Sequence, residues 1–267
     1  MSDQRAAWAR FSPRFDFEGG FAFVVVAILL LAAETLILFR YGDIGLLVHT
    51  LTVITLILFV YQFEDPVALL FQSLILVPIL RIFNLGIPTF TDNSLVFLGI
   101  IYLFILMSTW QIVRSQDLSL NDLGLTVSDA RRFVPGMVIG AGFGLIQFFF
   151  SLEPLQYEPN IKNYVLVILV TGLLVGFVEE VIFRGLIQRW AGEVFGQWPA
   201  IIGVSVLFGF MHSVWLAPMD IVFAGTVSIF LGWIYATSRN MWFITGIPAM
   251  INITAFLIAP LYMSYGN

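Results

Sequence analysis

The stretch at residues 178–185, Val-Glu-Glu-Val-Ile-Phe-Arg-Gly, places Glu179, Glu180 and Arg184 inside an otherwise apolar part of the chain. The flanks, residues 164–177 and 181–190, are almost free of other charges. An acid at membrane depth costs about 2.5–3.5 kcal/mol on insertion scales, so such residues are usually functional. The stretch therefore predicts a working site in a membrane-embedded fold.

The composition supports a membrane protein. Hydrophobic residues make up 60% of the 267 residues and charged residues only 11%, whereas a soluble domain carries roughly 25% charged residues. Lys162 is the single lysine and there is no basic stripe, so nucleic acid is not expected as a partner. Cysteine is absent, which excludes disulfides and cysteine metal sites. The expected partner is the lipid bilayer.

Nine apolar segments are long enough to be considered as membrane spans, since about 20 helical residues cross the hydrocarbon core. They are residues 21–39, 44–61, 67–82, 95–113, 133–152, 164–190, 199–216, 221–236 and 241–262. The third is short and ends at Arg81, so eight spans, with this segment re-entrant or merged, is the alternative. The sequence thus predicts an all-α bundle of eight or nine transmembrane helices.

Cytoplasmic loops of membrane proteins are enriched in arginine and lysine. A cytoplasmic N-terminus assigns eight arginines to the inside: Arg5, Arg10, Arg14, Arg114, Arg131, Arg132, Arg189 and Arg239. The outside then receives Arg40, Arg81 and Lys162. We therefore expect a multi-pass protein of the cell membrane or another internal membrane, with its N-terminus in the cytoplasm and, for nine spans, its C-terminus outside.

The expected organisation has four parts. Residues 1–20 form a cytoplasmic N-terminal segment, and residues 21–113 form the N-terminal transmembrane helices. Residues 114–132 form a cytoplasmic loop, and residues 133–267 form a C-terminal transmembrane half that holds the strong candidate chemistry.

The charged residues of the sixth segment have a helical arrangement. Glu180 and Arg184 are four residues apart and can pair on one helix face, whereas Glu179 lies about 100° further round the helix. One glutamate can therefore hold the arginine while the other faces a cavity. The alternative is an internal ion pair that only orients helices.

Two further spans offer polar groups. His212 follows Phe208 by one helical turn, and Gly209 between them permits close helix packing. A carboxylate and an imidazole are the usual pair for general acid–base chemistry near neutral pH. Asn252 has an amide that can donate to a developing oxyanion. The alternatives are a hydrogen-bonded core histidine and an interhelical clasp.

Depth is consistent with one site. At 1.5 Å per residue from the chosen span ends, Glu179 lies ~17 Å, His212 ~20 Å and Asn252 ~17 Å deep. Glu34 and His49 have no second polar partner at helical spacing, so structural or lipid-edge roles are expected for both.

Other chemistries have weaker support. The chain has two histidines and no His-Glu-x-x-His motif, and Arg184 would oppose a cation beside the glutamates. We therefore expect no metal and no other cofactor. A transporter that relays protons or cations through the acids remains an alternative, although no inverted sequence halves are visible.

The motifs resemble a known family. Glu179-Glu180-x-x-x-Arg184 followed by Phe208-x-x-x-His212 is similar to the CPBP family of type II CAAX prenyl endopeptidases and bacteriocin-processing proteases, also called Abi. Residues 230–240 resemble the family's third core helix and its turn, and residues 121–126 resemble a Leu-Gly-Leu segment found upstream. The resemblance covers residues 164–255 and implies a four-helix catalytic core.

The resemblance also implies a mechanism for an intramembrane glutamic protease. Glu179 is the general base on a water and His212 assists it. Arg184 holds the glutamate pair, Glu180 supports that ion pair or positions the peptide, and Asn252 binds the oxyanion. Phe208 and Phe183 are supporting residues. The cavity is expected to open to the cytoplasm and laterally to lipid, for a lipid-anchored or transmembrane peptide that is prenylated in CAAX-type substrates.

One position departs from the family pattern. The last motif is usually His-x-x-x-Asn, but Pro248 stands four residues before Asn252. Loss of one oxyanion donor raises a barrier by about 2.7–4 kcal/mol. Either another donor replaces the histidine, or the enzyme is slow, or the chain binds a membrane peptide without cleaving it, as a chaperone, immunity or scaffold protein.

Overall fold

The computed structural model describes residues 17–86, 91, 93–150 and 157–265. Most of the predicted N-terminal segment, residues 1–16, lies outside this part. All regular structure in the described residues is helical, and nine helical stretches are long and apolar enough to cross a membrane. The predicted fold class is therefore confirmed, with nine spans rather than eight in the described chain.

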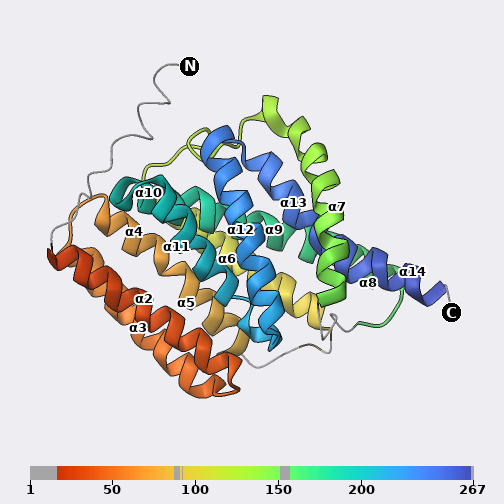
Figure 1. Cartoon of the computed structure of the whole chain (residues 1–267), viewed down its shortest axis with the longest axis horizontal. Helices are drawn as coiled ribbons and strands as arrows, with labels where there is room; N and C mark the ends of the chain where they lie inside the picture. Colours follow the sequence, from red (N-terminus) through yellow and green to blue (C-terminus); the bar gives the residue numbers. More distant parts are fainter. Residues whose placement is uncertain (1–16, 87–90, 92, 151–156, 266–267) are drawn as a thin grey trace.

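Four of the described spans belong to the N-terminal half, and Figure 1 labels their α-helices. They are α2 (Phe17–Leu38), α3 (Gly42–Gln62), the continuous run α4 (Val67–Leu74), α5 (Leu76–Arg81) and η1 (Ile82–Gly86), and α6 (Ser94–Ser115). The short η2 (Val127–Arg132) is the start of the fifth span. The third span extends through Arg81 to Gly86. The expected end at residue 82 was too early because Arg81 is buried inside the bundle instead of marking a loop.

After α7 (Phe133–Phe150), the C-terminal half holds one long continuous helix that alternates between α- and π-helical segments, followed by three further spans. The long run comprises α8 (Ile161–Leu166), η3 (Val167–Val175), α9 (Gly176–Glu180), η4 (Val181–Gln188) and α10 (Arg189–Phe195). The remaining helices are α11 (Gln197–Phe210), η5 (Ser213–Trp215), α12 (Pro218–Ser238), α13 (Met241–Ile253), η6 (Thr254–Ile258) and α14 (Ala259–Tyr265).

Asparagine caps begin the helices that carry the candidate site. The side chain of Asn93 accepts hydrogen bonds from the first backbone N–H groups of α6, and Asn160 and Asn240 do the same for α8 and α13. Asn93 also donates from Nδ2 to Asn163 at 2.8 Å, which joins the starts of α6 and α8. These caps fix where each span enters the bundle.

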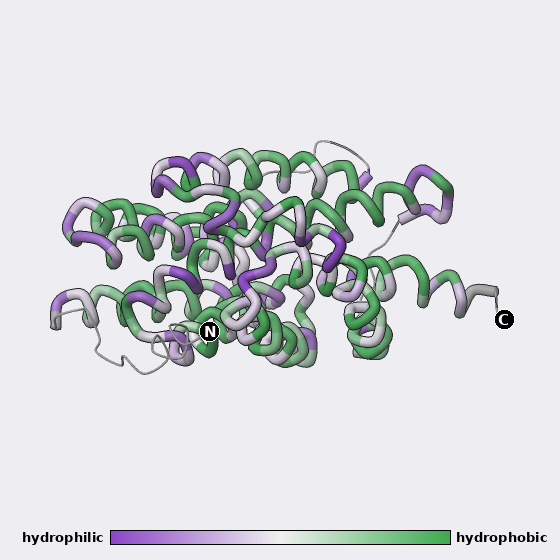
Figure 2. The backbone as a smooth tube through the Cα atoms, turned by 90° about the horizontal axis from the view of Figure 1, so that it is seen from above, coloured by the Kyte–Doolittle hydropathy of each residue, from purple (hydrophilic) through white to green (hydrophobic). Residues whose placement is uncertain are grey.

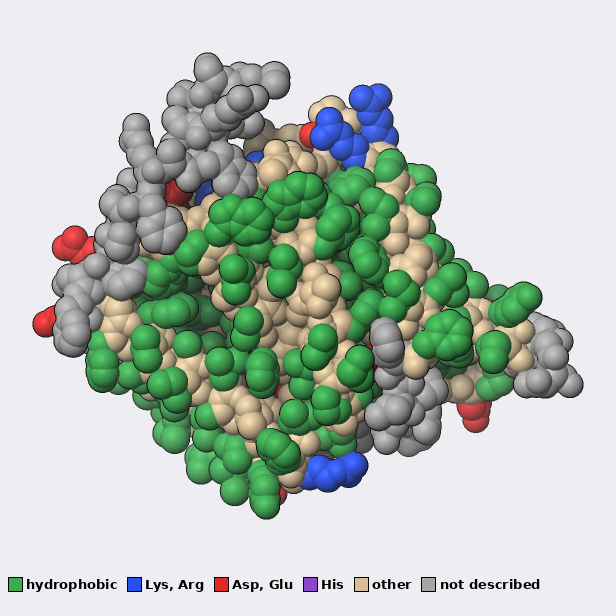
Figure 3. Space-filling model, viewed as in Figure 1, with side chains coloured by type: hydrophobic (Ala, Val, Ile, Leu, Met, Phe, Trp, Pro, Cys, Tyr) green, Lys and Arg blue, Asp and Glu red, His purple; other side chains and the backbone are tan. Residues whose placement is uncertain are grey.

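The two ends of the bundle differ in charge. We call the end where α2 begins the N face and the other end the far face. Because consecutive spans alternate in direction, the described arginines 114, 131, 132, 189 and 239 lie at the N face, and only Arg40 and Lys162 lie at the far face. Figure 3 shows basic side chains at the rims and hydrophobic ones over the surface between. Figure 2 shows hydrophobic stretches along the helices.

Helices α7 and α13 approach each other through glycines spaced by four residues. A Cβ added at Gly136, Gly140 or Gly144 would lie 2.2 to 2.8 Å from a backbone oxygen of α13. Small residues at this spacing let membrane helices pack backbone to backbone. This contact holds α13, and with it Asn252, against the rest of the bundle.

We predict that Gly140→Leu destabilises the protein, because its Cβ would lie 2.3 Å from the Ile247 carbonyl oxygen. Overpacking of this kind costs about 1–3 kcal/mol or more. Gly142→Leu is the matched control, since a Cβ there meets nothing within 4 Å. Thermal unfolding in detergent should lower the midpoint for the first variant only, and equal midpoints would contradict the close contact.

Candidate active site

The glutamate pair lies in a single α-helical turn between two π-helical segments. α9 holds Glu179 and Glu180, with η3 before it and η4 after it. π-helical turns are rare and frequently occur at functional sites. The local backbone therefore sets this turn apart from the rest of the span.

Glu180 is the structural member of the pair. Its Oε1 accepts a hydrogen bond from Arg184 Nη1 at 2.9 Å, and both side chains are fully buried. Arg184 also donates from Nη2 to the Ser228 hydroxyl at 2.8 Å, which ties η4 to α12. Glu180 does not line the cavity described below, and its side chain belongs to the ion pair with Arg184.

Aromatic rings connect this ion pair to the predicted histidine. The Arg184 guanidinium carbon lies 4.9 Å from the centre of the Phe208 ring. Phe208 packs edge-on against Phe183 at 4.9 Å and lies 5.1 Å from the His212 ring. Phe183 and Phe208 therefore form a layer between the buried charges and the imidazole.

Glu179 faces a different environment. Its Oε1 accepts a hydrogen bond from the Tyr102 hydroxyl of α6 at 2.6 Å. Among the described residues Arg184 hydrogen-bonds to Glu180 and makes no hydrogen bond to Glu179. Tyr102 was not identified from the sequence, because a single tyrosine in an apolar span gives no spacing signal.

One cavity of about 410 Å³ brings the candidate residues together. Glu179 from α9, His212 from the turn after α11 and Asn252 from α13 all line it, together with Phe183 and Phe208. Its other walls come from α5, η1, α6, α7, η3, η5 and η6. The three residues that the sequence placed at a similar depth thus share one space.

The hydrogen bonding of His212 determines its free nitrogen. Nδ1 lies 3.0 Å from the Phe208 carbonyl oxygen. A carbonyl can only accept, so the proton of the neutral ring belongs on Nδ1 and the lone pair on Nε2. His212 is therefore suited to accept a proton or a water hydrogen bond in the cavity.

Asn252 has already used part of its donor capacity. Its Nδ2 donates to the Thr171 carbonyl oxygen in η3 at 2.7 Å, which leaves one amide N–H for a ligand. Pro248 is buried in α13 and does not line the cavity. A Cβ on Gly176 would lie 3.2 Å from the backbone nitrogen of Ala249, so this part of α13 packs closely on α9.

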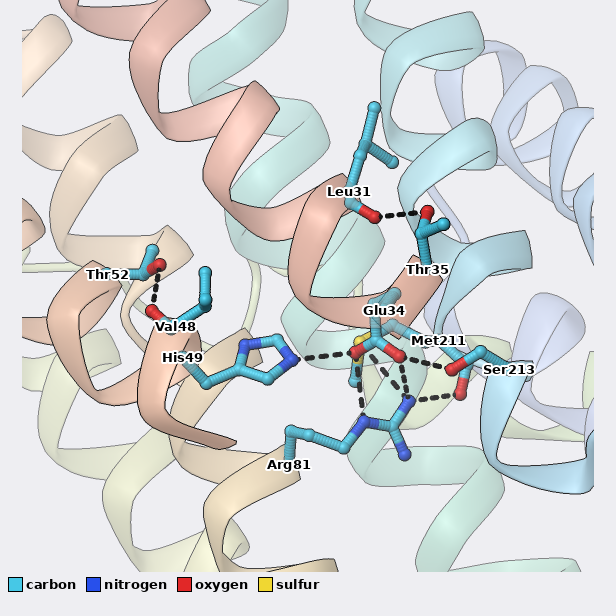
Figure 4. Close-up of polar contacts among 9 residues, drawn as sticks. All are labelled: Leu31, Glu34, Thr35, Val48, His49, Thr52, Arg81, Met211 and Ser213. Atoms are coloured by element: carbon cyan, nitrogen blue, oxygen red, sulfur yellow. Dashed lines mark hydrogen bonds and ion pairs between the residues drawn. The ribbon is translucent and has the colours of Figure 1, made fainter. Parts of the chain in front are cut away.

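A second buried charge cluster lies beside the cavity (Figure 4). Arg81 donates to both carboxylate oxygens of Glu34 at 2.9 Å and to the Met211 carbonyl oxygen at 2.5 Å. Glu34 also accepts from the Ser213 hydroxyl at 2.5 Å, and His49 Nε2 lies 3.2 Å from it. Glu34 and His49 are therefore core residues, not lipid-edge residues as one expectation allowed.

The cavity lies toward the far face. Its walls include Asn84 and Leu85 at the end of η1, Ser94 at the start of α6, and Trp215 after α11. All four belong to span ends remote from the N face. A cytoplasmic N-terminus and a cavity that opens to the cytoplasm are thus incompatible, although the sequence suggested both.

A metal site has no support from the described side chains. No three His, Asp or Glu side chains gather there in a way that could hold an ion. The Arg184 and Arg81 guanidinium groups near the glutamates add positive charge that would oppose a cation.

Comparisons with known proteins point to one family. Residues 161–254 match the family model described as type II CAAX prenyl endopeptidase Rce1-like. This segment runs from α8 to the start of η6 and contains Glu179, Glu180, Arg184, His212 and Asn252. It agrees with the resemblance to the CPBP family, a family of intramembrane proteases of CAAX type. No curated protein and no solved structure matches the chain.

We predict that Tyr102→Phe keeps the fold but lowers any activity that depends on Glu179. A hydrogen bond to a charged group contributes about 1.5–3 kcal/mol, which corresponds to roughly 10- to 150-fold in rate if the carboxylate loses its orientation. The measurement is turnover at equal amounts of folded protein. Tyr262→Phe, an exposed tyrosine far along the last span, is the control. Unchanged turnover in Tyr102→Phe would show that Tyr102 does not position Glu179.

Proposed function

From the match of residues 161–254 to the Rce1-like family, we propose that the chain is an intramembrane endopeptidase for membrane-anchored peptides. The observation that carries the proposal is the shared cavity of Glu179 and His212. A carboxylate and an imidazole with a free Nε2 in one cavity are able to activate a water between them. The apolar walls suit a substrate with a lipid anchor or a transmembrane segment.

The proposed reaction uses residues of this chain throughout. Glu179 takes a proton from a water while His212 Nε2 orients it, and the water oxygen bonds to the peptide carbonyl carbon. The carbonyl electron pair moves to its oxygen, and the remaining N–H of Asn252 donates to this oxyanion. The intermediate then releases the amine, which takes the proton from Glu179. One C–N bond is broken and one water is consumed.

A non-catalytic binding protein is the second candidate. Its support is specific: Pro248 stands in the usual place of a histidine donor, and the Asn252 amide has one N–H engaged by Thr171. Such a protein would hold a membrane peptide in the same cavity without cleaving it. Turnover by the intact chain separates the two candidates.

The orientation follows from the charged ends of the bundle. Five described arginines lie at the N face, and Arg40 and Lys162 lie at the far face. Arg81 is buried, so it is left out of the count of basic residues at either face. The positive-inside rule therefore favours a cytoplasmic N face. In that orientation the cavity opens toward the non-cytoplasmic side, and its substrates reach it from that leaflet.

We predict that Glu179→Gln abolishes cleavage of a membrane-anchored peptide, because an amide cannot take a proton from water. The expected loss is about 10²- to 10⁴-fold. Glu193→Gln on exposed α10 is the control and should retain full activity. A panel of prenylated and transmembrane peptides, in lipid nanodiscs, provides the assay. Full activity in Glu179→Gln would refute the assignment of the base.

The absence of cysteine allows a clean test of orientation. We predict that a membrane-impermeant maleimide labels Glu158→Cys at the far face and Leu85→Cys at the cavity rim in intact cells, but labels Ser128→Cys at the N face only after lysis. All three positions are exposed. The reverse pattern would place the cavity on the cytoplasmic side and restore cytoplasmic CAAX-type substrates, without contradicting proteolysis.

A further inference from the structure

Arg81 has a free edge directed away from its buried partners. Its Nε and Nη2 make all of its hydrogen bonds within the described residues, to Glu34 and to the carbonyl oxygen and Sδ of Met211. Nη1 has no hydrogen-bond partner among the residues that the structure describes, and Figure 4 shows it pointing away from Glu34. A guanidinium carries five N–H donors, so two remain available.

The same side chain lines the candidate active-site cavity. Arg81 is 2% exposed and forms part of the wall shared by Glu179, His212 and Asn252. Tyr102 lines the same cavity. Toward the described residues Nη1 makes no hydrogen bond, and it is not among the fully enclosed side-chain atoms, so it is able to donate to an acceptor inside the cavity.

The cluster around Arg81 holds the guanidinium in a fixed orientation. Glu34 binds it through two parallel hydrogen bonds, the geometry that best fixes an arginine. Ser213 and His49 in turn contact Glu34, so the carboxylate itself cannot rotate freely. A donor that is already oriented needs no reorganisation when charge develops in front of it.

Arg81 is the one cationic side chain in the described lining of the cavity, whereas the donors on Asn84, Gln147 and Trp215 are neutral. Asn252 has one N–H left, the Tyr102 hydroxyl is engaged by Glu179, and Pro248 supplies no side-chain donor. A tetrahedral oxyanion is best stabilised by two or more fixed donors.

Resting on the proposed function, we infer that Arg81 Nη1 binds the carbonyl oxygen of the scissile peptide bond and stabilises the oxyanion together with Asn252. Arg81 is then a catalytic residue contributed by the third span, outside the segment 161–254 that matches the family. The ligand group is a peptide carbonyl that becomes an alkoxide as water adds to it.

A pair of variants separates this role from a purely structural one. The single variant Glu34→Gln breaks the ion pair but keeps the Arg81 guanidinium. The double variant, Glu34→Gln with Arg81→Met, breaks the same pair and also removes the guanidinium, so that no unpaired charge stays buried. We expect the single variant to lose less than about tenfold in kcat, because the guanidinium is still present but is no longer held by two charged hydrogen bonds. The double variant should lose about 100-fold in kcat with KM changed less than threefold. Equal losses of kcat in both variants would assign Arg81 to structure alone.

A binding measurement gives a result even for a chain that does not cleave. The probe is a prenylated peptide aldehyde, whose hydrate, formed when water adds across the C=O bond, resembles the tetrahedral intermediate. In nanodiscs it should bind the double variant at least tenfold more weakly than it binds wild type and Glu34→Gln.

The outcomes distinguish the two proposals. Binding that depends on Arg81 without any cleavage would refute proteolysis and keep Arg81 as a carbonyl-binding residue. The role of Arg81 would be refuted if the wild type cleaves the peptide while all three proteins bind the aldehyde equally, or while none of them binds it. The proposed function would then still stand.

Discussion

Pairing of buried charges is the constraint on which this structure depends. The two buried arginines of the described chain, Arg81 and Arg184, each contact one buried glutamate, Glu34 and Glu180. Removal of one partner from such a pair costs about 3–5 kcal/mol, because the other charge stays buried and unpaired. Of the glutamates 34, 179 and 180, Glu179 is the one without an arginine of its own. Its one side-chain partner in the described residues is the neutral Tyr102 hydroxyl, so it keeps an oxygen for the cavity.

Both ion pairs also fix His212. Arg81 binds the carbonyl of Met211, and Glu34 binds the hydroxyl of Ser213, so the residues on either side of the histidine are held by one cluster. One turn earlier, Phe208 lies over Arg184 and accepts the Nδ1 proton at its carbonyl. The imidazole is thus restrained from three directions, although α11 ends at Phe210 and the chain there is no longer a regular helix.

The sequence predicted the features that depend on local spacing. The length of the apolar segments predicted the nine spans, and the spacing of four residues predicted the Glu180–Arg184 pair. Contacts between distant spans have no such signal. The Glu34–Arg81 pair joins residues 47 positions apart, and the Tyr102–Glu179 pair joins residues 77 positions apart. Arg81 was misread as a loop residue because a hydropathy pattern treats every charge as exposed. The packing role of the glycines at 136, 140 and 144 is visible only in the structure, where α13 lies against them.

The replacement of histidine by Pro248 has a structural counterpart in the packing of α13. At this level α13 and α9 are in contact through backbone, since even a methyl group on Gly176 would meet the nitrogen of Ala249 at 3.2 Å. A proline ring has no polar atom to bury and its missing N–H needs no partner, so the position suits a dry helix contact and contributes nothing polar to the cavity. Any second donor for an oxyanion therefore has to come from another wall. The third span provides a guanidinium there, and the cluster that neutralises its charge uses only three of its five N–H groups. The charge that makes the third span difficult to recognise in the sequence is, on this argument, the group that completes the site.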